Sequence, residues 1–340
     1  MKAVVYRSTG GPEVLQLVER EIPAVAPGEV RVRVVVSGVN PTDWRSRSGQ
    51  SSGLRFAEQV PHQDGAGVVD AVGDGVQDFA PGQRVWLWDV AFDSPAGTAQ
   101  EFVSVPARHV VPLPDSASFD VGASLGIPAL TAHRTLTTSA RGPHRLGPGT
   151  MAGRTVLVQG GAGAVGHAAI QLAAWSDATV LATVSSPEKA ELARKAGAHQ
   201  VIDYRTEDVA ARVSQLSPAG VHHIVEVDLG SNLAVDLAAL AHGGNINVYS
   251  YGNGDRLPIP SREMLVKNVQ LDFTFTYTTD PDSKANALAD VRAAAADGAM
   301  EVGAEHGLPI HRYSLDRVAE AHRAVEGGLL GKVLVDVASA

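Results

Sequence analysis

The chain has 340 residues, with 28 Lys+Arg against 37 Asp+Glu and a formal net charge of -9. So acidic a protein is a poor candidate for binding phosphate backbones, which argues against nucleic acid as a main partner. The chain contains 0 cysteines, so disulfides, thiolate catalysis and cysteine-ligated zinc are excluded as well. The sequence shows neither a signal-peptide core nor a membrane-length run of about 18 apolar residues. We therefore expect a cytoplasmic protein without membrane contact, and the length predicts about two domains.

The first third of the chain has the pattern of short strands. Residues 30–34 alternate valine and arginine, as a half-buried strand does. Two further apolar runs, 65–69 and 83–86, are separated by glycine and proline turns. Helical periodicity is scarce in this part of the chain. The pattern predicts a small β-rich domain.

From about residue 125 the pattern changes to alternating strands and helices. A strand at 155–159 precedes a small-residue helix at 164–175, and a second strand spans 178–184. The next helix begins at Pro187, with Ser186 as its predicted N-cap. Further strands are predicted at 200–202, 223–227, 245–248 and 269–275. This alternation indicates an α/β fold with a doubly wound parallel sheet.

The last strand, predicted at 332–337, has no obvious partner in the α/β segment. We expect it to pair with the N-terminal β domain instead. On this reading the α/β unit is an insertion within the β-rich domain.

The strongest chemical signal is a glycine-rich turn with the spacing Gly161-x-Gly163-x-x-Gly166. It directly follows a predicted strand and directly precedes a predicted helix, the context in which this spacing binds a dinucleotide. Glycines let the backbone approach a pyrophosphate, and the helix N-terminus offers it unpaired N–H groups. The alternative is a turn that only packs the helix on the strand. The predicted cofactor-binding residues here are Gly161, Ala162, Gly163, Ala164, Val165 and Gly166.

The end of the second strand predicts which dinucleotide binds. NAD-binding units place a carboxylate there for the ribose 2′-OH. This chain has Ser185 and Ser186 instead, and Lys189 follows within one helical turn. Tyr204 and Arg205, after the third strand, can reach the same region. Hydroxyls and an ammonium suit a 2′-phosphate, so we predict NADPH; the alternative leaves Lys189 in solvent and Tyr204 in the packing.

At this point the sequence resembles a known family, the zinc-free medium-chain dehydrogenases/reductases, and within it the zeta-crystallin-like NADPH:quinone oxidoreductases. The similarity runs nearly from end to end. Each matching segment is modest, but their order and spacing together are specific. The matching segments, besides the glycine turn, are 1–4, 38–43, 64–69, 72–73, 82–85, 126–132, 184–189 and 201–205.

The resemblance implies a GroES-like β-rich catalytic domain formed by residues 1–124 and 279–340. It implies an inserted Rossmann NADP(H)-binding domain at 125–278 and a homodimer formed through edge strands of the Rossmann sheet, here 269–275. Residues matching Lys189 and Tyr204 contact the 2′-phosphate in the family. Residues at the nicotinamide end and beside the reacting ring also match. These are Thr131, Tyr249, Tyr251 and Asn40.

Zinc-dependent relatives carry a Cys in place of Asn40 and a Gly-His-Glu triplet in place of 62–64. Asn40 cannot replace a thiolate, so we expect no metal. Without a Lewis acid the acceptor must itself be electrophilic. We expect hydride transfer from NADPH to a quinone or, alternatively, to the C=C bond of an enone or enal. A third reading is an NADPH-binding structural or regulatory protein with little turnover.

Three catalytic residues are expected around the acceptor. Asn40 is predicted to donate to the acceptor's oxygen or to its water. Asp43 is expected to order the loop, with a proton relay as the alternative. Many quinone reductases have Tyr where Arg45 stands and Gly where His62 stands, so Arg45 and His62 predict a more cationic cleft. Arg45 pointing to solvent, or pairing with Asp43, is the alternative. Trp88 is predicted either to line an aromatic acceptor pocket or to pack in the core.

Overall fold

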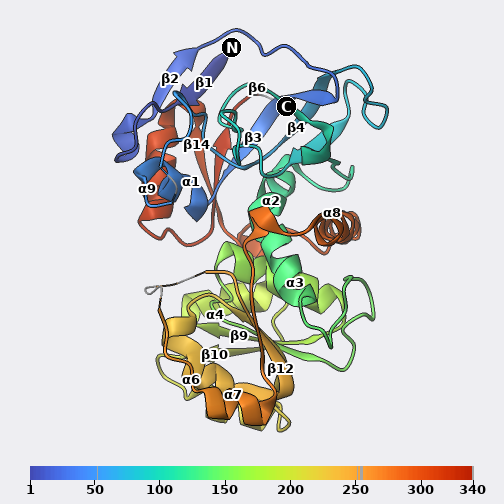
Figure 1. Cartoon of the computed structure of the whole chain (residues 1–340), viewed down its shortest axis with the longest axis vertical. Helices are drawn as coiled ribbons and strands as arrows, with labels where there is room; N and C mark the ends of the chain where they lie inside the picture. Colours follow the sequence, from blue (N-terminus) through green and yellow to red (C-terminus); the bar gives the residue numbers. More distant parts are fainter. Residues whose placement is uncertain (52, 251, 253–255, 339–340) are drawn as a thin grey trace. The chain divides into compact units, whose positions relative to one another are not determined.

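The computed structural model describes residues 1–51, 53–250, 252 and 256–338 of the chain (Figure 1). The chain divides into two compact units, Met1–Ile127 with Pro309–Ala340, and Pro128–Leu308. The boundary between them falls inside one long helix, α2 (Phe119–Thr137). This mixed α/β architecture confirms the predicted fold class.

The first unit is built on antiparallel strands. Its seven-stranded sheet has the order β14-β15-β3-β4-β5-β7, with β6 also paired to β3, and a separate ladder joins β1 to β2. All neighbours are antiparallel except β14 and β15. The strands are β1 (Lys2–Val5), β2 (Gln16–Glu19), β3 (Glu29–Val39), β4 (Asp64–Val72), β5 (Arg84–Leu87), β6 (Phe102–Pro106), β7 (Val110–Pro112), β14 (Ile310–Ser314) and β15 (Lys332–Asp336). The helices are α1 (Pro41–Ser48) and α9 (Val318–Glu326), with 3₁₀ turns η1 (Pro12–Val14), η2 (Ala107–His109) and η5 (Leu315–Arg317).

The last strand joins the N-terminal sheet, as the sequence predicts. β15 pairs antiparallel with β3, Val333 opposite Val39. Alternating valines of β3, together with β4 and β6, fill one hydrophobic core of this unit. The pairing places the start of β15 beside the end of β3, where α1 begins.

The second unit holds the doubly wound sheet. Its strands run parallel in the order β10-β9-β8-β11-β12-β13, the order 3-2-1-4-5-6 of a dinucleotide-binding fold. The strands are β8 (Thr155–Val158), β9 (Thr179–Val184), β10 (Gln200–Asp203), β11 (Val221–Glu226), β12 (Leu240–Val248) and β13 (Gln270–Phe273). The helices are α3 (Ala164–Trp175), α4 (Pro187–Lys195), α5 (Val209–Leu216), α6 (Leu229–Ala239), α7 (Ser261–Lys267) and α8 (Pro281–Ala296), with 3₁₀ turns η3 (Thr276–Thr278) and η4 (Ala304–His306).

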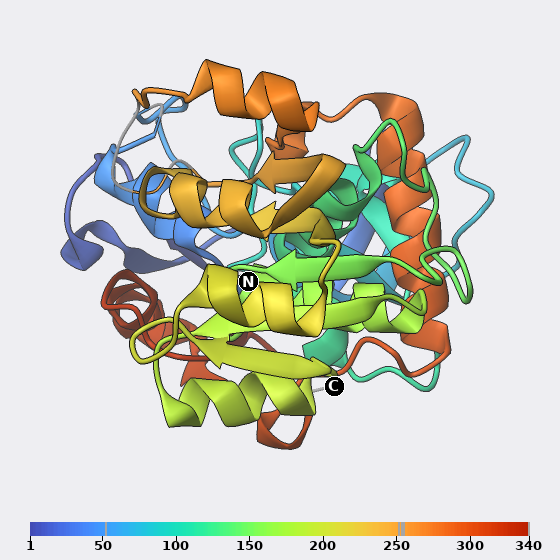
Figure 2. The ribbon, with the colours of Figure 1, turned by 90° about the horizontal axis from the view of Figure 1, so that it is seen from below.

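Helices cover both faces of this sheet. In Figure 1, α3 and α4 lie on one side of the strands and α6 and α7 on the other, and Figure 2 shows the strands between them from below. Apolar side chains of the strands and of α5 and α6 form the core on one face. Because the strands are parallel, all of their carboxyl ends meet at one edge, where ligands of such sheets bind. Among the described residues, no helix is both long and apolar enough to cross a membrane.

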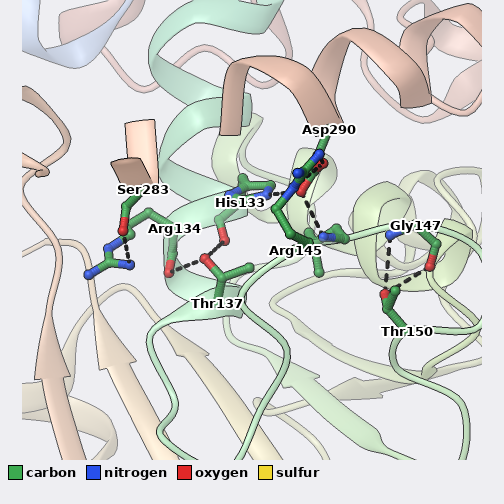
Figure 3. A network of polar contacts seen from close by, with 9 residues as sticks. His133, Arg134, Thr137, Arg145, Gly147, Thr150, Ser283 and Asp290 are labelled. Carbon is green, nitrogen blue, oxygen red and sulfur yellow. Dashed lines mark hydrogen bonds and ion pairs between the residues drawn. The ribbon is translucent and has the colours of Figure 1, made fainter. Parts of the chain in front are cut away.

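The segment 279–308 differs from its predicted place in the catalytic domain, because it packs with the second unit. Helix α8 contacts α3, and its buried Asp290 binds side chains and backbone of the same unit (Figure 3). Asp290 Oδ2 accepts from His133 Nε2 at 2.9 Å and from the Leu146 N–H at 2.7 Å. Its other oxygen accepts from Arg145 Nε at 2.7 Å. This carboxylate ties α8 to α2 and to the loop that precedes β8.

Replacing Asp290 with alanine is expected to lower the free energy of unfolding by about 2–3 kcal/mol. The change leaves His133 buried without its partner and the Leu146 N–H unsatisfied. Asp297→Ala is the matched control, because Asp297 is an exposed aspartate at the end of the same helix, where it accepts from Trp175 Nε1 at 3.0 Å. Urea unfolding followed by circular dichroism measures both. Equal midpoints for the two variants would show that Asp290 does not hold α8.

Candidate functional site

The glycine-rich turn connects β8 to α3, as predicted. Two of its glycines serve packing. A Cβ on Gly161 would lie 2.8 Å from the Ala182 Cβ, and one on Gly166 would lie 2.4 Å from the Gly160 oxygen. At these two positions any side chain would push the helix off the strand.

Gly163 differs from those two glycines. It is the N-cap of α3, with φ −79° and ψ 161°, a conformation open to any residue. An added Cβ would meet only the Gly160 oxygen, at 3.5 Å. The space above Gly163 is therefore open, and it lies at the helix N-terminus, where Ala164 and Val165 begin the first turn. These features fit a pyrophosphate approaching the backbone.

Buried polar side chains support the turn from below. The Thr183 hydroxyl accepts from the Gly160 N–H at 3.2 Å and donates to Gln159 Oε1 at 2.6 Å. Gln159 in turn donates to Asp236 Oδ1 at 2.7 Å. Burial, and then the neighbouring Glu226 carboxyl, raise the pKa of Asp236 well above its usual value. Sequence reasoning missed this network; its one visible signal was the polar Gln159 at the end of an otherwise apolar predicted strand.

The predicted 2′-phosphate residues lie together at the carboxyl ends of β9 and β10. Lys189 Nζ donates to Ser185 Oγ at 2.9 Å, and Ser186 caps α4 by accepting the Lys189 N–H at 3.3 Å. The Tyr204 N–H donates to the Val184 oxygen at 3.1 Å, and the Tyr204 side chain is 53% exposed. An ammonium and a hydroxyl thus lie at the end of β9, which itself carries no carboxylate, and Tyr204 with its exposed phenol is bonded to the same strand end through its backbone.

The residues expected at the nicotinamide end belong to the second unit. Tyr249 follows β12, and its N–H donates to the Glu226 oxygen at 3.1 Å. Thr131 is buried within α2. Tyr251 lies outside the described residues. The contact of all three with a nicotinamide stays a prediction.

Asn40 and Asp43 occupy a buried corner of the first unit, where β3 ends and α1 begins. Asn40 is the N-cap of α1, and its backbone N–H donates to Asp43 Oδ2 at 2.7 Å in a capping box. Asp43 therefore orders this turn, and a part in proton transfer stays a prediction. Burial raises the pKa of Asp43, against a lowering by the Asn40 N–H.

Two charged residues complete this corner, and sequence reasoning did not assign them to the site. Asn40 Nδ2 donates to Asp64 Oδ2 at 2.6 Å, and Asn40 Oδ1 accepts from Lys332 Nζ at 2.7 Å. Burial raises the pKa of Asp64 to about 6, although Lys332 and Asn40 both lower it. Burial lowers the pKa of Lys332, while Asp64 and Asp43 raise it. The sequence signal for Lys332 was its position at the start of a predicted apolar strand. A lysine buried there needs a charged or polar partner, and this could have pointed to the site.

His62 does not line an accessible cleft surface in the first unit. Its side chain is fully buried, with Nδ1 at 2.8 Å from Ser37 Oγ and Nε2 at 2.9 Å from His322 Nε2. Its backbone φ of 81° is uncommon for a non-glycine residue. Burial, and then His322, lower the pKa of His62 well below its usual value. Both ring nitrogens are engaged inside the unit, which corrects the predicted role of His62 as a cationic cleft residue.

Arg45 and Trp88 lie in different surroundings. The Arg45 guanidinium carbon lies 5.6 Å from the centre of the Trp44 ring. Trp88 follows β5, is 7% exposed, and has its ring 4.7 Å from that of His109. This burial favours the packing alternative for Trp88, whereas a role for Arg45 toward an acceptor stays a prediction.

The described residues hold no group of three or more His, Cys, Asp or Glu side chains that could bind a metal ion. His62 and Asp64, which share one short segment, turn to different partners.

Comparison with known proteins identifies both units. Residues 26–115 match the alcohol dehydrogenase GroES-like domain, and residues 164–293 match a domain described as zinc-binding dehydrogenase. The chain is 31% identical to human quinone oxidoreductase over 339 residues, which covers 98% of this chain and 97% of the human one.

Two solved structures bear on the cofactor. A mycobacterial protein complexed with NADPH is 29% identical, with a TM-score of 0.81 over 98% of this chain and 99% of that one. An NAD-dependent alcohol dehydrogenase is 28% identical, with a TM-score of 0.84 over 99% of this chain and 100% of that one. Proteins of similar fold are thus described with either dinucleotide, so the fold alone does not select between NADPH and NADH.

Proposed function

Since the chain belongs to the quinone oxidoreductase family of medium-chain dehydrogenases/reductases, we propose that it reduces a quinone with NADPH. The observation that carries this proposal is the arrangement at one sheet edge. The open Gly163 lies at the N-terminus of α3, and the Lys189–Ser185 pair lies at the end of the neighbouring strand β9. The first suits a pyrophosphate and the second a 2′-phosphate.

When bound, NADPH supplies the hydride. The chain's own residues hold the cofactor and the acceptor. The backbone of 161–166 and the first N–H groups of α3 bind the pyrophosphate, while Ser185, Lys189 and Tyr204 bind the 2′-phosphate. Asn40 donates to the acceptor's oxygen. A quinone suits such a site, because it is electrophilic enough to need only hydrogen bonds at its oxygen.

The test is NADPH oxidation with different acceptors. We expect loss of reduced-nicotinamide absorbance with 1,4-benzoquinone and with 9,10-phenanthrenequinone, and little with a simple enone. Activity with the enone alone would replace the proposal with reduction of a C=C bond. NADPH binding without turnover on any acceptor would instead indicate a non-catalytic, cofactor-binding protein.

We also propose that two copies pair through β13. This strand ends the order of the parallel sheet among the described residues, and Phe273 and Phe275 are 70% and 61% exposed there. An exposed strand edge with aromatic side chains is a ready pairing surface. Sedimentation should give the mass of two chains, and a monomer at micromolar concentration would refute the pairing.

A further inference from the structure

The side chain of Asn40 is held by two opposite charges inside the first unit. Its Nδ2 donates to Asp64 Oδ2 at 2.6 Å, and its Oδ1 accepts from Lys332 Nζ at 2.7 Å. All three side chains are buried, with Asn40 and Lys332 2% exposed and Asp64 0%. An ionised carboxylate can only accept and an ammonium can only donate, so these partners allow one orientation of the amide.

Strand pairing and backbone contacts fix the positions of Lys332 and Asp64. Lys332 is the first residue of β15, and the antiparallel pairing of β15 with β3 brings it beside Asn40. Its Nζ also donates to the Val39 oxygen at 3.3 Å and lies 3.9 Å from Asp64 Oδ2. Asp64 Oδ1 accepts the Ile127 N–H at 2.9 Å. A Cβ on Gly126 would lie only 2.1 Å from that oxygen, so the carboxylate occupies space that any side chain at position 126 would take.

An amide NH₂ has two hydrogens, and Asp64 takes one of them. Among the described residues the second hydrogen has no acceptor, so it is the hydrogen that Asn40 could offer to a ligand. A cation hydrogen-bonded to the amide oxygen draws electron density away from the amide nitrogen. This makes the remaining N–H a stronger donor. Lys332 provides this charge without touching the ligand itself.

We propose that Lys332 is a positioning residue for acceptor reduction: together with Asp64 it fixes the Asn40 amide and strengthens the N–H that Asn40 offers to the acceptor's oxygen. This inference rests on the proposed function. In the reaction, the acceptor takes up two electrons and one proton as hydride, and negative charge develops on its oxygen while NADPH is oxidised. The N–H of Asn40 stabilises that charge, and one proton from solvent completes the hydroquinone.

The experiment compares Lys332→Met, Asn40→Ala and the double variant, with Lys284→Met as the matched control. Lys284 is also a buried lysine, 8% exposed, but its Nζ donates to the Thr276 oxygen at 2.6 Å in the other unit. We expect Lys332→Met to lower kcat by about 10- to 100-fold, less than the roughly 100- to 1000-fold cost of losing an oxyanion donor outright, because Asn40 keeps its N–H. The KM for the acceptor should change less than about threefold, because the donor matters most as charge develops.

If Lys332 acts through Asn40, the double variant should be no slower than Asn40→Ala alone. Additive losses of kcat would overturn the proposal, and so would a folded Lys332→Met with unchanged kcat. Lys332→Gln keeps a donor without the charge. We expect it to fall between the wild type and Lys332→Met, and it carries the test if the methionine variant does not fold.

A second measurement does not depend on turnover. In protein labelled with ¹⁵N-asparagine, the Asn40 side-chain NH₂ signals, assigned by their loss in Asn40→Ala, should move markedly in Lys332→Met and stay in place in Lys284→Met. Unmoved signals in Lys332→Met would overturn the inference. If the wild type oxidises no NADPH but these signals move as expected, the proposed function fails while the hold of Lys332 on Asn40 stands.

Discussion

Replacing Gly163 with valine is expected to weaken NADPH binding by at least about 100-fold, or about 2.7 kcal/mol, while the protein stays folded. The fold should tolerate the side chain, because Gly163 has φ −79° and its Cβ would meet only the Gly160 oxygen, at 3.5 Å. Cofactor binding should not tolerate it, because the valine side chain fills the space through which the pyrophosphate reaches the helix N-terminus. Titration calorimetry with NADPH and a thermal melt measure the two effects separately.

Two other glycines serve as comparisons. Gly147→Val adds the same bulk to a loop position whose Cβ would meet only the Thr150 Cγ2, at 4.0 Å, so it should leave both affinity and melting temperature unchanged. Gly166→Val should instead unfold the second unit, since its Cβ would clash with the backbone of Gly160. Undiminished NADPH affinity in a folded Gly163→Val would show that the cofactor does not bind at this turn.

Reversing the charge at Lys189 is expected to have the second large effect on NADPH affinity. Lys189→Glu is expected to weaken NADPH binding by about 100-fold or more and to change NADH binding by less than about threefold. The ammonium lies against Ser185 at the end of β9, and a carboxylate there would repel the 2′-phosphate and accept a hydrogen bond from a ribose 2′-OH.

The control is Lys195→Glu, the same charge change in the exposed last turn of the same helix. Its effect on either nucleotide should be small, because an exposed charge remote from the ligand is screened by salt. Calorimetric titrations of NADPH and NADH against both variants give the ratios. A parallel loss of both nucleotides in Lys189→Glu would mean that this lysine does not read the 2′-phosphate.

The dinucleotide-binding half of the fold was predictable because its signals are local. The strand, the glycine turn and the helix follow one another within residues 155–175, and Ser186 with Pro187 starts α4 where expected. The return of the last strand to the first unit was also predictable, since an apolar strand needs a partner.

The buried corner around Asn40 was not predictable in the same way. Lys332 and Asn40 are 292 residues apart, and their contact depends on the register between β15 and β3, which the sequence pattern does not reveal. His62 was misplaced for a similar reason, because its partners Ser37 and His322 come from β3 and α9. The segment 279–308 was assigned to the catalytic domain because nothing in its helical pattern shows the contact of Asp290 with His133.

The most direct test of NADPH-dependent quinone reduction is the ratio of kcat/KM for NADPH to kcat/KM for NADH. It is measured on the wild-type protein with 1,4-benzoquinone as the acceptor. Selection by Ser185 and Lys189 predicts a preference for NADPH of about 100-fold or more. Equal rates with the two nucleotides, or faster oxidation of NADH, would contradict it.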